Sequence, residues 1–285
     1  MLLYKVIFAD DTNLFMSNQN PFVLQTELNA ELAKVDTWFK CNKLSLNIKK
    51  TNYIVFTTAQ SQINTENFIL KINKQEIERV RSTKFLGVMI DDQLNFKCHI
   101  DYLMLKLSKY LGLFYKIRHY LPKSALIVLY KTLFEPHLDY CNVIWCNTYE
   151  THISKLLVLQ RKIIWAISWS EYRAHAPPLF LRLGLLRITE FNEYHNVCIM
   201  FQVVNGLNAR LCELVPIKYP QHVYGTRNTD HVYGKDRKLV GTSHSVVCRG
   251  PQIWNKLDAS LKKVRSFSKF KKKIKDLLLS QYETE

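Results

Sequence analysis

The chain of 285 residues is long enough for one large domain or two modest ones, and its 47% hydrophobic content excludes a disordered, low-complexity protein. Its 40 basic and 24 acidic residues leave a formal net charge of +16. No stretch reaches the roughly 20 apolar residues that a membrane-spanning helix needs. No leader of charged and then apolar residues opens the sequence, and the seven cysteines are scattered singly. We therefore expect an intracellular protein, cytoplasmic or nuclear, with reduced thiols and no membrane partner.

The N-terminal part of the sequence predicts short strands. Residues 4–8 are β-branched and aromatic, residues 9–11 predict a turn, and residues 12–16 return as the second strand of a tight hairpin. Further short strands are predicted at residues 52–57, 68–72 and 84–90.

Helical periodicity dominates the rest of the chain, as the low count of eight glycines and eight prolines leads us to expect. A first helix begins at Pro21 and carries an apolar stripe from Leu24 to Phe39. Residues 219–249 lack a clear period and predict a loop with short strands. Later apolar stripes predict helices at residues 103–117, at 122–133 with Pro136 following the end, and at 153–167, 187–204 and 267–278.

Several kinds of site are disfavoured by the residues that would have to form them. The glycines never approach a dinucleotide-binding or P-loop pattern, so we expect no small-molecule cofactor. Cys141 and Cys146 lack a second compact pair of zinc ligands, and we expect buried free cysteines there and at Cys198, Cys212 and Cys248. We interpret four tryptophans as core anchors and not as base-stacking platforms, namely Trp145, Trp165, Trp169 and Trp254.

Asp10 and Asp11 place two carboxylates at the tip of the predicted hairpin. Mg²⁺ prefers hard oxygen ligands, and paired carboxylates on a rigid turn can hold it against substrate phosphates. Two such ions stabilise the attacking and leaving oxygens in two-metal phosphoryl transfer. Aspartate also favours turns for local reasons. The identical pair Asp91–Asp92 lacks this flanking pattern, so the dipeptide alone identifies no site.

Longer motifs extend the pattern around the two aspartates. Residues 8–11 (FADD), between apolar strands, resemble the [FY]-x-D-D box of reverse transcriptases. Residues 44–56 (LSLNIKKTNYIVF) resemble the segment that follows this box, and residues 84–88 (KFLGV) resemble the turn associated with gripping the primer end. Three later segments resemble the thumb and distal region of non-LTR retrotransposon enzymes of the jockey and CR1-like kind: residues 138–141 (LDYC), 159–162 (LQRK) and 249–255 (RGPQIWN).

The resemblance implies a role for each matching residue. Asp10 would be the principal Mg²⁺ ligand of the turn, with Asp11 beside it. Lys50 would help to protonate the departing pyrophosphate, although a surface lysine beside Lys49 fits the sequence equally well. The primer terminus would be contacted by Phe85, Leu86, Gly87 and Val88, whose alternative interpretation is a plain buried strand with a glycine at a bend.

The same resemblance implies parts that these residues do not supply. Polymerases of the family pair the hairpin aspartates with a third carboxylate from an earlier strand, and they hold the incoming nucleotide with fingers. Since Met1 lies three residues before the first predicted strand, we expect the chain alone to bind Mg²⁺ weakly or not at all and to be inactive.

Basic side chains gather on two of the predicted helices. Residues 256–276 hold nine lysines or arginines, which can form a solvated face or contact an anionic membrane surface. Together with a lysine face on the helix at 103–117, they favour binding to the backbone of an RNA template or an RNA–DNA duplex. The candidate contacts are Lys106, Lys109, Lys116, Lys269, Lys272 and Lys273.

The sequence as a whole predicts an α+β, predominantly helical fold. We assign residues 1–92 to the remnant of a right-hand polymerase palm, 93–175 to a helical thumb and 176–285 to a helical, basic C-terminal region. Three functions stay open: a fragment of a retrotransposon RNA-directed DNA polymerase, a non-catalytic nucleic-acid-binding module, or a decayed copy without function. The sequence does not indicate an oligomeric state.

Overall fold

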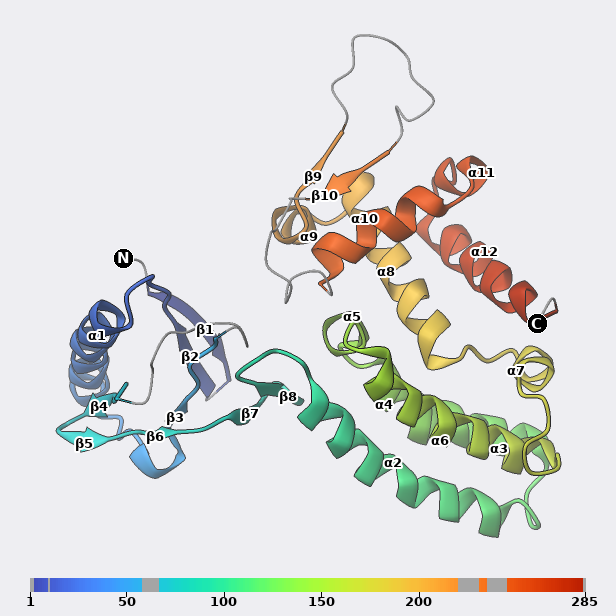
Figure 1. Ribbon diagram of the computed structural model, residues 1–285, viewed down its shortest axis with the longest axis horizontal. Helices are drawn as coiled ribbons and strands as arrows, with labels where there is room; N and C mark the ends of the chain where they lie inside the picture. Colours follow the sequence, from blue (N-terminus) through green and yellow to red (C-terminus); the bar gives the residue numbers. More distant parts are fainter. Residues whose placement is uncertain (1–2, 10, 58–66, 220–230, 235–244, 284–285) are drawn as a thin grey trace. The chain divides into compact units, whose positions relative to one another are not determined.

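The computed structural model describes residues 3–9, 11–57, 67–219, 231–234 and 245–283 (Figure 1). The chain divides into two compact units, unit 1 (residues 1–85 and 90–94) and unit 2 (residues 86–89 and 95–285). Its described elements are mainly helices with small sheets, as the sequence predicts. Residues 58–66, 220–230 and 235–244, which include much of the predicted loop at 219–249, lie outside the description.

Unit 1 is built from one long helix and several two-stranded sheets. A 3₁₀ turn at Ile48–Lys50 lies between the long helix and the strand that follows it. The regular elements are β1 (Tyr4–Phe8), β2 (Asp11–Phe15), α1 (Pro21–Cys41), β3 (Asn52–Tyr53), β4 (Lys71–Ile72), β5 (Gln75–Glu76), β6 (Glu78–Arg79), β7 (Ser82–Phe85) and the second half of β8 (Val88–Asp91). The chain leaves the unit after Phe85 and re-enters it at Ile90.

The core of unit 1 lies where α1 packs against β4 and the residues before it. Leu32 of α1 is buried against Phe68, Leu70, Ile72 and Ile77. Polar side chains of the helix complete the backbone hydrogen bonding at this contact. Asn29 Oδ1 accepts from Lys71 N–H at 2.8 Å, and its Nδ2 donates to the Ile69 carbonyl at 3.3 Å. The predicted strands at 52–57 and 68–72 are shorter than expected, since only β3 and β4 form ladders there.

Unit 2 is almost entirely helical. Its helices are α2 (Lys97–Ile117), α3 (Lys123–Leu129), α4 (Glu135–Asp139), α5 (Asn142–Trp145), α6 (Glu150–Ser168), α7 (Pro177–Leu183), α8 (Ile188–Val204), α9 (Ala209–Leu214), α10 (Val246–Lys256), α11 (Ala259–Lys262) and α12 (Phe267–Ser280), with the short strands β9 (Ile217–Lys218) and β10 (Tyr233–Gly234) and a C-terminal 3₁₀ turn at Gln281–Glu283.

Two groups of packed helices organise unit 2. Figure 1 shows α2 and α6 side by side, and their buried faces carry Leu103, Leu107 and Leu156. The other group packs α8 against α10 and α12, where the rings of Phe201 and Phe270 stack with centroids 4.2 Å apart. Burying such large apolar side chains stabilises each by about 1.5–3 kcal/mol relative to exposure.

The helix predicted to end before Pro136 continues through it, so this boundary is wrong. A π-helical segment at Tyr130–Phe134 joins α3 to α4. Pro136 occupies the first turn of α4, where a proline costs no intrahelical hydrogen bond. An insertion of this kind lets the helix pass a proline that would otherwise stop it.

Candidate catalytic and nucleic-acid-binding residues

The hairpin predicted around the two aspartates is confirmed. β1 and β2 are antiparallel, with Phe8 paired opposite Asp11. Ala9 has φ 52°, the left-handed conformation that two-residue hairpin turns favour. The second strand begins at Asp11, one residue earlier than predicted. Asp10, the expected principal metal ligand, lies outside the described residues.

Asp11 is exposed at the start of β2, so its carboxylate is accessible to a cation. Around it the two-stranded ribbon exposes large apolar side chains, with Ile7 68% and Phe8 61% exposed. The donor chemistry fits Mg²⁺, which takes carboxylate oxygens. In the described part of the chain, however, no three His, Cys, Asp or Glu residues come together as a metal-binding group. The metal-ligand role of Asp11 therefore stays a prediction.

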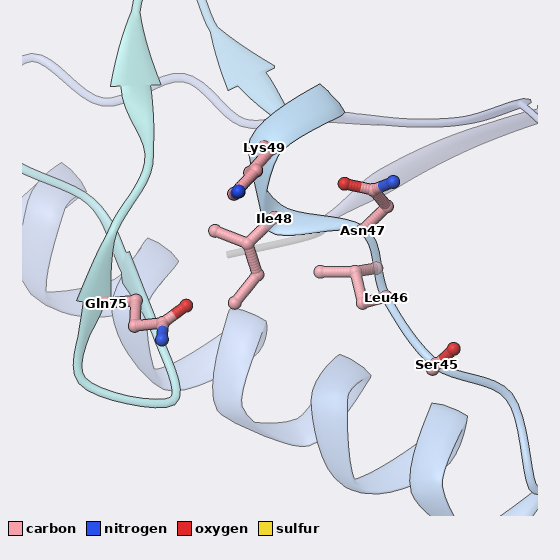
Figure 2. Close-up of a pocket in the computed structure, with 6 residues that line it drawn as sticks. All are labelled: Ser45, Leu46, Asn47, Ile48, Lys49 and Gln75. Atoms are coloured by element: carbon pink, nitrogen blue, oxygen red, sulfur yellow. The ribbon is translucent and has the colours of Figure 1, made fainter.

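Lys50 ends the 3₁₀ turn and is exposed. In the preceding loop Leu46 and Ile48 pack on the core of unit 1. The neighbouring polar residues Asn47 and Lys49 are exposed. An open hollow of about 390 Å³ lies beside this loop. Figure 2 shows the residues that line it: Ser45, Leu46, Asn47, Ile48, Lys49 and Gln75. Lys49 lines the hollow, whereas Lys50 does not. The role of Lys50 near a pyrophosphate stays a prediction.

Residues 84–90 form a hairpin turn, and the single strand predicted there is wrong. β7 ends at Phe85 and β8 begins at Val88, with Leu86 (φ 44°) and Gly87 (φ 88°) between them. Two consecutive left-handed residues reverse the chain, which apolarity alone could not indicate. Val88 is buried in unit 2, while the Phe85 ring contacts that of Phe15 edge-on at 6.3 Å in unit 1.

The turn at Leu86 and Gly87 is held by Tyr140, a residue of the LDYC segment at 138–141. Tyr140 donates its hydroxyl hydrogen to the Leu86 carbonyl at 2.7 Å. A Cβ on Gly87 would lie 3.2 Å from Cε1 of the same Tyr140 ring. Two observations favour glycine at this position: the positive φ, and the Tyr140 ring that a Cβ would crowd.

Gly87→Ala should lower the free energy of unfolding by about 1–2 kcal/mol, because alanine is strained in the left-handed region. Gly112→Ala is the matched control, since Gly112 lies in α2 with nothing within 4 Å of its virtual Cβ. That change should instead stabilise the chain by about 0.5–1 kcal/mol. Urea unfolding followed by circular dichroism measures both. Equal effects of the same sign would contradict the assignment of the turn.

His99 contacts β8, the strand that follows this turn, and the sequence did not indicate this contact. Met89 N–H donates to His99 Nδ1 at 3.3 Å, and the imidazole lies edge-on to Trp145 with centroids 5.2 Å apart. His99 is 3% exposed, and burial lowers its pKa to about 4. The available signal was a histidine next to the apolar stripe of the predicted helix.

The six candidate lysines lie on α2 and α12. Lys109 and Lys116 of α2 are exposed, whereas Lys106 is half-buried. On α12 the buried residues Phe270, Ile274 and Leu278 mark the inner face, and Lys269, Lys272 and Lys273 are all exposed. Ion pairs to these six lysines are absent among the residues that the structure describes. Both helices can therefore offer positive charge to a polyanion.

The expectations for cysteine and tryptophan are met only in part. Cys146 and Cys198 are buried, and burial raises the pKa of Cys146 to about 12 and that of Cys198 to about 11. The other cysteines of the zinc argument are only half-buried (Cys141, Cys212 and Cys248). Trp145 and Trp254 are core residues, Trp165 is half-buried, and Trp169 is 53% exposed. The core assignment of Trp169 is therefore wrong.

Comparison with known proteins gives one informative match. A curated protein of Drosophila melanogaster, "Probable RNA-directed DNA polymerase from transposon X-element", is 23% identical over 161 residues. The match covers 55% of this chain and 17% of that protein's length. No family model and no solved structure matches the chain. Over the described ranges, none of the helices combines the length and apolarity required to cross a membrane.

Proposed function

We propose that this chain is part of a retrotransposon RNA-directed DNA polymerase and comprises the end of its palm, its thumb and its distal region. The observation that carries the proposal is the β1–β2 hairpin, in which Asp11 begins the second strand directly opposite Phe8. The distant similarity to a transposon polymerase supports it. So does the order of the quoted motifs along the sequence.

The proposed chemistry is two-metal nucleotidyl transfer in the intact polymerase. Asp10 and Asp11 would hold Mg²⁺, which supplies charge stabilisation at the attacking and leaving oxygens. The exposed Asp11 carboxylate is compatible with this role. Lys50 would stand near the departing pyrophosphate, and residues 85–88 would position the primer end. The hydrogen bond from the Tyr140 hydroxyl to the Leu86 carbonyl would keep that turn rigid.

Primer extension tests the catalytic part of the proposal. With Mg²⁺, an RNA template and a DNA primer, we expect the 285-residue chain alone to give no templated synthesis. The physical reason is that one pair of adjacent carboxylates does not complete two metal sites. Robust synthesis abolished by Asp11→Ala would support the polymerase assignment and refute the predicted inactivity. Asp92→Ala is the control, because Asp92 lies outside the hairpin.

The alternative of a non-catalytic nucleic-acid-binding module is favoured by the exposed lysines of α12. Binding of an RNA–DNA duplex should weaken strongly as salt rises, because each phosphate contact releases counterions. The triple variant K269Q/K272Q/K273Q should reduce the salt slope by up to about 3 units. Fluorescence anisotropy of a labelled RNA–DNA duplex at several salt concentrations measures this slope.

The matched control for this prediction removes three lysines that already have acidic partners. Lys34, Lys71 and Lys155 form exposed ion pairs with Glu31, Glu76 and Asp101. K34Q/K71Q/K155Q changes the net charge equally and should alter the slope much less. An equal effect of the two triple variants would show that net charge, and not α12, determines binding. A cooperative thermal transition would argue against a decayed, unfolded copy.

A further inference from the structure

The exposed Trp169 occupies an unusual position in the helix that carries it. It caps the C-terminus of α6 with φ 57°, and its N–H donates to the Trp165 carbonyl. This left-handed cap position is one that glycine usually fills, because a side chain there costs about 1–2 kcal/mol. The helix thus ends on a strained residue whose large ring is 53% exposed. Backbone strain of this kind is concentrated at functional positions.

Side chains from the end of α2 surround the Trp169 ring. The Arg118 guanidinium carbon lies 4.9 Å from the centroid of Trp169 and 5.1 Å from that of Tyr115. His119 meets Trp169 edge-on at 5.0 Å. One turn back along α6, Trp165 contacts Tyr172, over whose ring Arg173 lies at 5.6 Å. We call this surface the aromatic–arginine patch, defined as Tyr115, Arg118, His119, Trp169, Tyr172 and Arg173.

The patch is exposed and strongly basic. Tyr172 is 63% exposed, and Tyr120, two residues after Arg118, is 86% exposed. Residues 115–125 and 161–175 contain six lysines or arginines and a single acidic residue, Glu171. A surface that served only as an apolar protein contact would not need this excess of positive charge. Aromatic faces alternating with guanidinium groups offer stacking planes and phosphate contacts together.

We propose that the aromatic–arginine patch binds single-stranded nucleic acid, with bases stacking on Trp169 and Tyr172 and with phosphates contacting the arginines. A single strand is favoured over a duplex because bases stacked within a duplex have their faces covered, whereas unstacked bases of a single strand expose them. The stacked guanidinium of Arg118 is preordered by two rings, so little side-chain entropy is lost when it contacts a phosphate. The site belongs to unit 2 and needs no polymerase chemistry. Binding at the patch can therefore be tested independently of the proposed catalytic role of Asp11.

Trp169→Gly separates binding from folding. Glycine is the residue best suited to the left-handed cap, so the variant should melt within a few degrees of the wild type. Loss of the stacking plane should raise the dissociation constant for a labelled 12-nucleotide oligouridylate or oligothymidylate roughly 5- to 100-fold. Tyr149→Ala is the matched control, because Tyr149 is also 53% exposed but lies at the other end of α6. It should leave affinity unchanged.

Tryptophan fluorescence gives a second readout. A strand stacked on Trp169 should quench the emission of the wild type and of Trp38→Phe, which removes an exposed tryptophan of unit 1, but not that of Trp169→Gly. Comparing the two oligonucleotides shows whether RNA or DNA is preferred. Unchanged affinity of Trp169→Gly for both would overturn the proposal. So would a dimer that Trp169→Gly dissociates without loss of oligonucleotide binding, since the patch would then contact a second copy of the chain.

Discussion

Glu190→Ala is expected to lower the free energy of unfolding by about 3–5 kcal/mol, the cost of leaving a buried charge without its partner. Arg187 donates to Glu190 through Nε at 3.0 Å and Nη2 at 2.7 Å, and both side chains are only 11% exposed. The Tyr282 hydroxyl donates to Glu190 Oε2 at 3.1 Å and accepts from Arg187 N–H at 2.9 Å. Removing the carboxylate would therefore leave the buried guanidinium without its acidic partner. It would also remove a hydrogen bond that holds the C-terminal 3₁₀ turn.

An exposed ion pair of the same unit provides the control for this prediction. Lys155 and Asp101 lie 3.4 Å apart, and their side chains are 48% and 49% exposed. Asp101→Ala should cost less than about 1 kcal/mol, because water screens such pairs. Urea unfolding of both variants gives the comparison. If the two losses were alike, the buried network would not be a main support of α8 and the C-terminus.

Acidification from pH 6.5 to 4 is expected to destabilise the fold by about 2–3 kcal/mol through His99 alone. Burial lowers its pKa from 6.5 to about 4 in the folded state, so the unfolded chain binds the proton more tightly over this range. The stabilising contribution is full above pH 6.5 and is lost as the pH falls through the folded pKa. Protonation would also break the hydrogen bond that Met89 N–H donates to Nδ1.

His99→Asn tests this mechanism, since its Oδ1 can accept from Met89 N–H but does not titrate. The variant should be less stable at neutral pH, because the ring no longer packs on Trp145, yet its stability should change less between pH 6.5 and 4. His175→Asn removes an exposed histidine and should keep the wild-type pH dependence. A parallel profile for His99→Asn and the wild type would contradict the role of His99.

Local signals in the sequence were enough to locate the main helices. The predicted start at Pro21 is the first residue of α1, and the stripes at 153–167 and 187–204 lie within or one residue from α6 and α8. The hairpin at residues 4–15 was likewise predictable, because strand propensity and turn residues act over a few positions. Of the candidate site, the sequence predicted the exposed turn and the exposed lysines of α12. The roles of Asp11, Lys50 and residues 85–88 stay predictions.

Only the tertiary structure decided which polar groups meet across the chain. Tyr140 and Leu86 are 54 residues apart, and Tyr282 and Glu190 are 92 apart. Gln160, which lies within the helix predicted at residues 153–167, is buried, and its side-chain amide donates to the Leu186 carbonyl and to the Tyr130 hydroxyl. Such partners depend on how helices pack, because a buried polar group takes whatever donor or acceptor the fold brings near.

Trp169 shows the same division in a single residue. Its apolar character and its position after the stripe of α6 indicated burial, but the left-handed cap turns its ring outward beside Arg118. Periodicity determined that a helix forms here and which face is apolar, since both follow from contacts three or four residues apart. What the capping side chain meets follows from the neighbouring end of α2, because Arg118 and His119 reach the Trp169 ring from a segment about 50 residues earlier in the chain.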